Sequence, residues 1–472
     1  MDLEEAGEKW RAGDPTKALR FFVKAVNQYD AGLRIFPTSF DLAYNKARLQ
    51  YEITQQPRLF RQLPDTLIDL LKAARESHIV AYQLNSSDAD NMFNLGQVCT
   101  SLAEAMLDVR DLTEEHAKDA SQLLQQALET LEACLRIQEK QIQEAEALSH
   151  TPASKDDGTS SIIDDTDPAD AEVSEVWASV VEPLTTQDLF ETCLARIEAV
   201  KGLCELQASS NVDAIGLIEA TLSSDVRERL SQYGQHPDQV WRSTIAVAGV
   251  HSAYAEVRLQ TTTADLNTFE SDIQNSLGML KSLPEAESRE ESLVALGETH
   301  LAYNSAIESF FARNETPKEL IMSLNRRRWD HITAGLTSFT IASKLSPVTN
   351  LARIHVSRGD CELLRVRLGD QPCDYEFARK RHETLLKNAA VYYKAAKSVF
   401  SHQKSGTIDE VFELDLKLVI TGILLGDSTV HLSDLTRGDD AKVSRQFADI
   451  LAQGLLGAEM TSRVEQAFVT GR

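Results

Sequence analysis

The stretch LNSSDADNMFNLGQVC, residues 84–99, carries the most information about the fold. We predict that one helix ends near Leu84, that a tight polar turn follows, and that a second helix contains Leu95 and Gly96. A glycine inside a helix costs roughly 1 kcal/mol relative to alanine, so it usually marks a place where a second helix packs closely. The stretch therefore predicts two helices that are joined by a short turn and that meet other helices closely at Gly96.

A second pattern recurs along the chain: a small residue, a bulky residue four positions later, and a small residue three positions after that. Spacings of four and three lie on one face of a helix, so each triplet predicts a helix that packs closely on a partner. The six copies are Ala18-Phe22-Ala25, Ala74-His78-Ala81, Ala120-Leu124-Ala127, Ala214-Ile218-Thr221, Gly335-Phe339-Ala342 and Ala389-Tyr393-Ala396. Gly202 stands 12 residues before Ala214, and Gly96 stands 22 residues after Ala74. These two steps add up to a period of about 34 residues.

The joint at residues 84–99 and the six triplets resemble the tetratricopeptide repeat (TPR) family. Several copies are degenerate, and Ser86 stands where that family has a proline. The resemblance covers most of the chain. It implies an all-α fold, a right-handed superhelix (solenoid) of antiparallel helix pairs. It also implies that the first helices line a concave groove that binds a protein segment, while the second helices form the convex back.

The repeat register assigns nine residues of first helices to this groove. They are Asp41, Tyr44, Arg48, Tyr51, Asp90, Phe93, Gln97, Glu291 and Glu298. Aromatic and arginine side chains dominate the energetics of protein interfaces, so we expect Tyr44, Arg48, Tyr51 and Phe93 to carry most of the affinity. The alternative is that these four side chains pack between repeats.

One branch of the family holds the acidic C-terminal tail of heat-shock chaperones with a clamp of lysines, asparagines and an arginine. The corresponding positions here are Leu3, Gly7, Lys46, Asn91 and Leu95. Only Lys46 is basic, and it stands in the place of an asparagine. We therefore do not expect this chain to bind that tail.

The chain divides into three parts. Residues 1–148 hold the N-terminal repeats, residues 149–183 form an acidic linker with an anchoring segment, and residues 184–472 hold the C-terminal repeats and capping helices. Between 149 and 175 the chain has eight acidic residues and one lysine. Such a composition cannot bury enough apolar surface to offset ordering, so we predict a disordered acidic insertion. Trp177 either anchors the returning chain or, with the insertion, folds over the groove and competes with a bound client.

The chain has 48 basic and 72 acidic residues, a net charge of −24. This balance favours a basic protein client and disfavours direct binding of nucleic acid or an anionic membrane, although acidity alone also keeps a helical protein soluble. The sequence has no run of the roughly 18 apolar residues that a membrane span needs, and the acidic N-terminus is not that of a signal peptide. We expect a cytoplasmic protein that is also found in the nucleus.

We find no catalytic, nucleotide-binding or metal-binding motif, and therefore expect a non-enzymatic protein without cofactor or metal. The six cysteines form no Cys-x-x-Cys pair and are expected to be reduced core residues. His78 stands in a triplet, which indicates a core histidine. The basic runs Arg326-Arg327-Arg328 and Arg379-Lys380-Arg381 indicate either solvated helix turns or a phosphate-binding or nuclear-import patch.

Taken together, these patterns predict a protein-binding scaffold. Its expected role is that of an acidic escort or assembly chaperone for a basic client, such as a ribosomal or other nucleic-acid-binding protein, because opposite charge speeds capture and masks the client. The alternative is a structural adaptor subunit of a larger intracellular complex, in which the charge is incidental.

Overall fold

The computed structural model describes residues 2–108, 113–149, 184–209, 214–222, 224–261, 265–403, 408–427 and 440–470. Its helices are α1 (Leu3–Arg11), α2 (Pro15–Ile35), α3 (Phe40–Thr54), α4 (Pro57–Phe60), α5 (Leu67–Leu84), α6 (Ala89–Leu107), α7 (Glu114–Ser149), α8 (Thr186–Ser209), α9 (Ile215–Leu222), α10 (Ser224–Tyr233), α11 (Pro237–Thr261), α12 (Leu266–Lys281), the 3-10 helix η1 (Ala286–Ser288), α13 (Glu290–Arg313), α14 (Lys318–Ala342), α15 (Leu351–Arg367), α16 (Glu376–Arg379), α17 (His382–Gln403), α18 (Ile408–Leu425), α20 (Asp440–Ala452) and α21 (Ala458–Thr470). The described residues contain no strand, which confirms the all-α prediction. The predicted acidic insertion and Trp177 lie outside these residues, apart from Ser149 at the end of α7.

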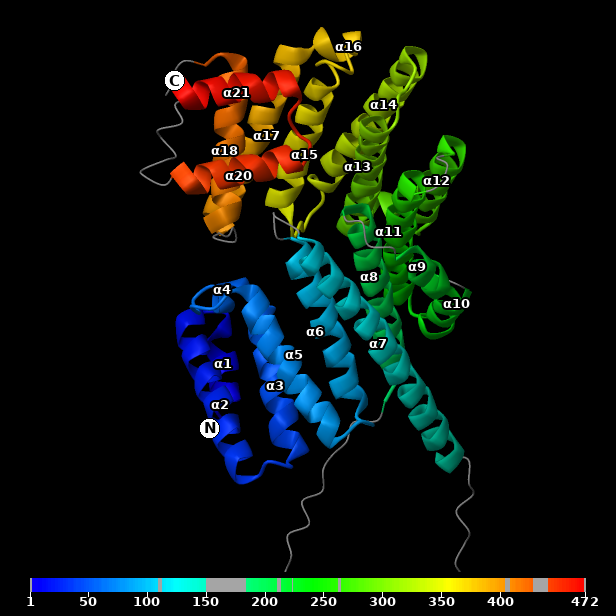
Figure 1. Ribbon diagram of the computed structural model, residues 1–472, viewed down its shortest axis with the longest axis vertical. Coiled ribbons are helices and arrows are strands. Elements are labelled where there is room, and N and C mark those ends of the chain that lie inside the picture. The colour runs from blue at the N-terminus through cyan, green and yellow to red at the C-terminus, as the bar shows by residue number, and fades with distance from the viewer. Residues whose placement is uncertain are drawn as a thin grey trace, which may run out of the picture.

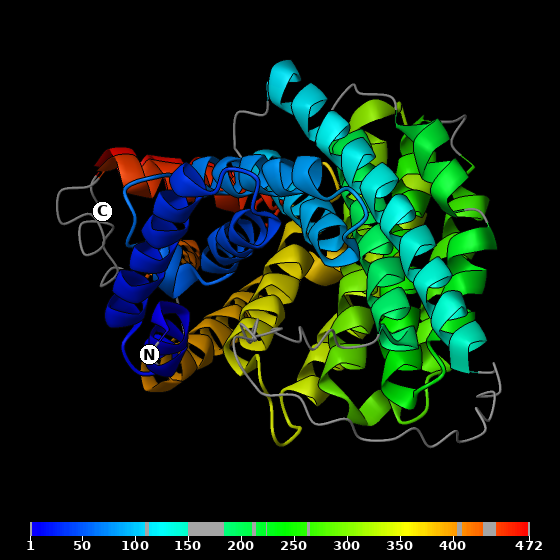
Figure 2. The same ribbon diagram turned by 90° about the horizontal axis from the view of Figure 1, so that it is seen from below.

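Neighbouring helices form antiparallel pairs (Figure 1). The pairs are α1 with α2, α3 with α5, α6 with α7, α11 with α12, α13 with α14, and α15 with α17. The first helices also contact one another along the array, as α6 contacts α8, α8 contacts α11, and α11 contacts α13. Seen from below, the array curves so that its N-terminal and C-terminal pairs lie on one side and α11–α14 on the other (Figure 2).

The turn between α5 and α6 follows the sequence prediction. Helix α5 ends at Leu84, and α6 begins at Ala89 with Asp88 as its N-cap. The Asp88 carboxylate accepts a hydrogen bond from the backbone N–H of Asn91 at 2.8 Å, which satisfies one of the free donors at the helix start. His78 is fully buried, and its Nδ1 lies 2.8 Å from Oδ1 of Asn91. The two helices are thus joined by a local cap and a buried side-chain contact.

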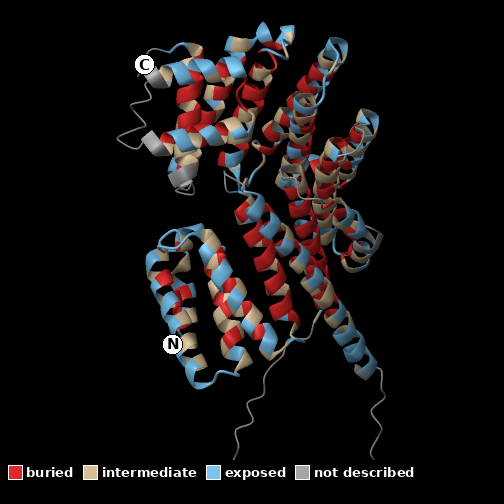
Figure 3. Ribbon diagram, in the orientation of Figure 1, coloured by how far each residue is buried: buried red, intermediate tan, exposed pale blue. Residues whose placement is uncertain are grey.

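Every residue of the six triplets is buried, including Gly335, which packs on backbone and side-chain atoms of α13. The bulky residue packs on a glycine of the paired first helix in three repeats: Phe22 on Gly7, Phe339 on Gly297 and Tyr393 on Gly359. A Cβ atom at any of these glycines would overlap the ring of its partner. Buried residues accordingly lie where helices face one another (Figure 3).

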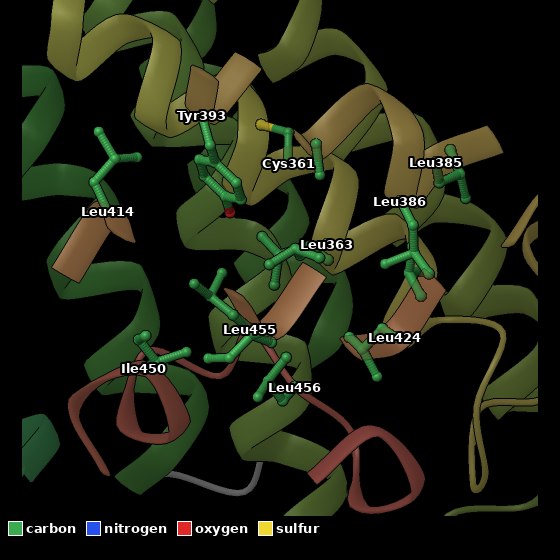
Figure 4. Close-up of a cluster of buried hydrophobic side chains, with 14 of the residues drawn as sticks. Cys361, Leu363, Leu385, Leu386, Tyr393, Leu414, Leu424, Ile450, Leu455 and Leu456 are labelled. Atoms are coloured by element: carbon green, nitrogen blue, oxygen red, sulfur yellow. The ribbon is translucent and has the colours of Figure 1, made fainter. Parts of the chain in front are cut away.

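The C-terminal core differs from the prediction in two places. The sequence predicts one helix over residues 375–400 and another over residues 440–465. The structure divides the first into α16 and α17 and the second into α20 and α21. Gly454 lies between α20 and α21 with a φ of +68°, a backbone conformation that L side chains rarely adopt. This turn brings Leu455 and Leu456 into the core formed by α15, α17 and α18 (Figure 4).

None of the helices in the described ranges combines the length and the apolar character that a membrane span needs.

Candidate functional site

A cavity of about 490 Å³ lies between α3, α6 and α8, the first helices of three successive pairs. We call it the acidic groove. Its lining residues are Tyr51 and Gln55 of α3, Gln97, Thr100, Ser101 and Glu104 of α6, and Ala195, Glu198, Lys201, Gly202 and Glu205 of α8. Gly202 of α8 packs closely on Leu124 of α7, where a Cβ atom would lie 3.0 Å from Leu124 Cδ2.

Three carboxylates and one cation line the acidic groove. Lys201 Nζ lies 3.7 Å from Glu205 Oε1. The carboxylate of Glu104 has no hydrogen bond or ion pair with any other residue that the structure describes. Burial raises the pKa of Glu104, and the negative charges of Glu205 and Glu198 raise it further. The lining of the groove therefore has three carboxylates and one lysine, and Arg242 acts on Glu198 from outside the lining.

The negative charges of the groove also act on the phenol of Tyr51. Its hydroxyl lies 3.1 Å from Oγ of Ser101. Burial raises the pKa of Tyr51 to about 12, and the charges of Glu104 and Glu198 act in the same direction, against the hydrogen bond with Ser101. Both carboxylates are therefore close enough to act on one aromatic ring at the floor of the cavity.

Four successive first helices each carry a glutamate with a raised pKa: Glu104 on α6, Glu198 on α8, Glu256 on α11 and Glu298 on α13. Burial is the largest cause in each case. Glu298 has an exposed side chain, yet neighbouring protein still removes part of its hydration. The charge of Lys201 lowers the pKa of both Glu198 and Glu298, which shows that α8 and α13 contribute to the same electrostatic environment.

Only Tyr51 and Gln97 of the sequence-predicted groove residues line the cavity. Arg48 instead forms ion pairs with Glu4 of α1 and, at 3.4 Å, with Glu52. The side chains of Asp41, Asp90, Glu291 and Glu298 are exposed on first helices outside the cavity lining.

Tyr44 and Phe93 pack between helices. The Tyr44 ring stacks on Phe40 with 5.7 Å between ring centroids and meets His78 edge-on at 6.5 Å. Its hydroxyl accepts a hydrogen bond from Asn94 Nδ2 at 3.4 Å. Phe93 is partly buried against the cluster that contains Cys134 of α7. These contacts favour the alternative of packing between repeats for Tyr44, Arg48 and Phe93.

The sequence prediction missed the three carboxylates of the groove. Glu104 follows the predicted Gln97 by seven residues, two helical turns on the same face, and could have been found by extending the register. Glu198 and Glu205 lie four residues before and three residues after Gly202, the glycine that the repeat register had already placed, so extending that register would have found them as well.

The helices and the groove together define an all-helical, repeat-like protein with an acidic cavity between first helices. No protein-family model matches the chain. It is similar to the UPF0656 protein C926.02 of Schizosaccharomyces pombe, with 25% identity over 414 residues, 86% of this chain and 84% of that protein. A solved circular tandem repeat protein with novel repeat topology and enhanced subunit contact surfaces aligns with 100% of this chain and 97% of its own at 15% identity. The TM-score of that alignment, 0.26, is too low to inform the fold.

Proposed function

We propose that this chain is a non-enzymatic, TPR-like scaffold that binds a basic segment of a protein client in the acidic groove. The observation that carries the proposal is the set of three glutamates that line one cavity in which Lys201 is the one lining cation, with Arg242 acting on Glu198 from outside the lining. In this proposal the helix pairs coil as a right-handed superhelix, and the protein acts in the cytoplasm or nucleus as an escort or assembly chaperone.

Partial desolvation of the groove carboxylates strengthens their attraction for a cation. A carboxylate that has lost part of its hydration, as the raised pKa of Glu104 indicates, interacts more strongly with a cation than a fully hydrated carboxylate does. A lysine or arginine of the client that entered the groove would supply the missing positive charge. Tyr51 and Gln97 at the same cavity offer a ring face and an amide to the rest of the segment.

The test is a binding titration with a fluorescein-labelled peptide of alternating lysine and arginine. The test variant combines Glu104→Gln with Glu198→Gln, which removes two charges at nearly constant volume. The matched control combines Glu287→Gln with Glu315→Gln, two exposed carboxylates outside the groove. We expect the test variant to bind about three- to tenfold more weakly, since partly exposed ion pairs contribute up to about 1 kcal/mol each.

Equal affinity of the test variant and the control would contradict the proposal. The salt dependence separates the escort from the adaptor alternative. Binding through the groove should weaken steeply between low and high salt, whereas assembly of a structural subunit through buried apolar contacts should not.

A further inference from the structure

The two basic runs of the sequence, 326–328 and 379–381, meet at one end of the molecule. Asn325 of α14 donates a hydrogen bond from Nδ2 to the carbonyl oxygen of Cys373 at 3.1 Å. Trp329 meets the ring of Phe377 edge-on with 5.1 Å between centroids. Figure 1 shows α16 and the first half of α14 at the same end of the array. The runs therefore belong to one region of the surface.

Most cations of the two runs are already neutralised or buried. Arg328 is buried, with Nε donating to Asn304 at 2.8 Å, and Arg327 pairs with Glu270. Arg379 pairs with Asp374, and Lys380 Nζ lies 2.6 Å from Glu376.

Two arginines remain. Neither Arg326 nor Arg381 has a carboxylate partner among the residues that the structure describes. So few unpaired cations do not make the dense positive surface that binding to a nucleic-acid backbone requires.

Large apolar side chains surround these arginines. Met322 is 69% exposed and Phe377 is 42% exposed. The Arg381 guanidinium lies over the Phe377 ring, 3.4 Å from its centroid. Met322, Arg326 and Trp329 are spaced by four and three residues, so they share one face of α14, the face that Trp329 turns toward Phe377. We call Met322, Arg326, Phe377 and Arg381 the α14–α16 surface.

We propose that the α14–α16 surface docks an acidic protein segment that carries one large apolar side chain. Aromatic residues, methionine and arginine are the side chains enriched at the core of protein interfaces. Charge complementarity determines the sign of the partner, because the two arginines of this surface form no ion pair with any carboxylate of the described residues. The stacking on Phe377 holds Arg381 in place before the partner arrives, which reduces the entropy lost on binding.

The experiment is a selection of random peptides displayed on phage against the immobilised full-length chain, followed by fluorescence anisotropy with an enriched peptide. The test variant combines Arg326→Ser with Arg381→Ser, and a second variant, Met322→Ser, removes apolar contact without changing charge. The matched control combines Arg20→Ser with Lys344→Ser, two exposed cations elsewhere. Circular dichroism first establishes that all variants are helical.

We expect the wild-type chain to enrich acidic peptides with one aromatic or aliphatic residue. The arginine variant should lose affinity for them by about tenfold or more, a typical effect of truncating an interface arginine. Met322→Ser should lower the affinity for the same peptides. The control and the groove variant with Glu104→Gln and Glu198→Gln should bind them as tightly as the wild type does.

Two results would overturn the proposal. One is that acidic peptides are absent from the selection or bind the arginine variant as well as the wild type. The other is that a single-stranded oligonucleotide, and no acidic peptide, binds in a manner that depends on Arg326 and Arg381. Whether the groove variant loses its affinity for a basic peptide tests the proposed function and has no bearing on the α14–α16 surface.

Discussion

Gly96 of α6, in the stretch 84–99, packs directly on Leu131 of α7. A Cβ atom on Gly96 would lie 2.5 Å from Cγ of Leu131, nearer than real Cβ atoms come to a neighbour. The sequence predicted a close helix contact here. It could not show which residue lies opposite, because Leu131 is 35 residues away along the chain and its side chain depends on how the two helices are rotated.

Replacing Gly96 by alanine or leucine should lower the free energy of unfolding, by about 1–3 kcal/mol for the larger side chain, because the helices must move apart. Urea denaturation followed by circular dichroism measures the change. Gly278→Ala is the matched control, since Gly278 lies in α12 with no atom near its missing Cβ. That control should stabilise the protein by up to about 1 kcal/mol, through helix propensity alone. An unchanged stability of Gly96→Leu would mean that the contact is absent.

Two largely buried histidines, His300 and His331, make the free energy of unfolding depend on pH. The Nδ1 atoms of His300 and His331 lie 3.1 Å apart, and the ring of His331 stacks on Tyr303 with 3.9 Å between centroids. Burial lowers the pKa of His300 to about 3, helped by the charges of His331 and Lys281. Burial also lowers the pKa of His331 to about 4, against the charges of Glu270 and Asp330. Both imidazoles are therefore neutral in the folded protein well below neutral pH.

The unfolded chain binds protons at these histidines near its ordinary pKa of about 6.5, whereas the folded chain does not. Their contribution to stability is therefore complete above about pH 6.5 and is lost as the pH falls toward about 4. Between about pH 7 and 5 the loss is at most about 2 kcal/mol per histidine. Urea denaturation at both pH values, compared with the variant His331→Gln, isolates this term from the carboxylates. The variant should show a smaller loss, and an equal loss would contradict the assignment.

At the scale of elements, a buried ion triad joins α15 to α18. Lys417 has a side chain that is 2% exposed, and its Nζ lies 3.0 Å from Asp360 and 3.1 Å from Glu413. Asp360 also accepts a hydrogen bond from the hydroxyl of Tyr393 of α17 at 2.7 Å. The three helices therefore share one polar contact inside an apolar core.

Lys417→Met should destabilise the protein by about 3–5 kcal/mol, because it leaves two partly buried carboxylates without their cation. Thermal or urea unfolding measures the loss. Lys387→Met on α17 is the control. It breaks an ion pair with Glu383 that is exposed to solvent, and should change stability little. If both substitutions had the same small effect, the triad would contribute nothing to the packing of α15 on α18.

Local patterns predicted the helices better than the breaks between them. The six triplets identified buried faces because small and bulky residues at spacings of four and three have few uses other than helix packing. The break between α20 and α21 was missed. In the sequence, nothing distinguishes Gly454 from other glycines in apolar segments. Its positive φ belongs to the turn that places Leu455 and Leu456 in the C-terminal core, and the residues of that core come from distant parts of the chain.

At the scale of the whole molecule, the acidic groove depends on α3, α6 and α8 being side by side. The sequence placed Tyr51 and Gln97 on first helices, and the structure puts both at the cavity. Tyr44 and Arg48 have the same residue types as interface hot spots, but their partners Asn94 and Glu4 come from other helices. No local pattern indicates whether such a side chain will meet a partner within the chain or remain available to a client.

The composition of residues 149–175 predicts that the acidic insertion contributes little to the folded core. Replacing residues 149–175 by a short glycine–serine linker should therefore change the free energy of unfolding by no more than about 1 kcal/mol. A thermal melt of the shortened chain tests this expectation. A large fall in melting temperature would show that the insertion packs on the repeats.

The most direct measurement is to locate a bound basic peptide on the chain. A lysine–arginine peptide with a benzophenone side chain is bound, photo-crosslinked and digested, and mass spectrometry identifies the attached residues. The account predicts crosslinks to α3, α6 and α8, at residues that line the acidic groove such as Tyr51, Gln97 and Ala195. At a peptide concentration below the Kd, their yield should fall by about three- to tenfold in the variant with Glu104→Gln and Glu198→Gln. If the crosslinks of the wild-type chain lie instead at the second cavity, which is lined by residues such as Lys72, Asp119 and Gln126 of α5 and α7, the acidic groove is not the binding site.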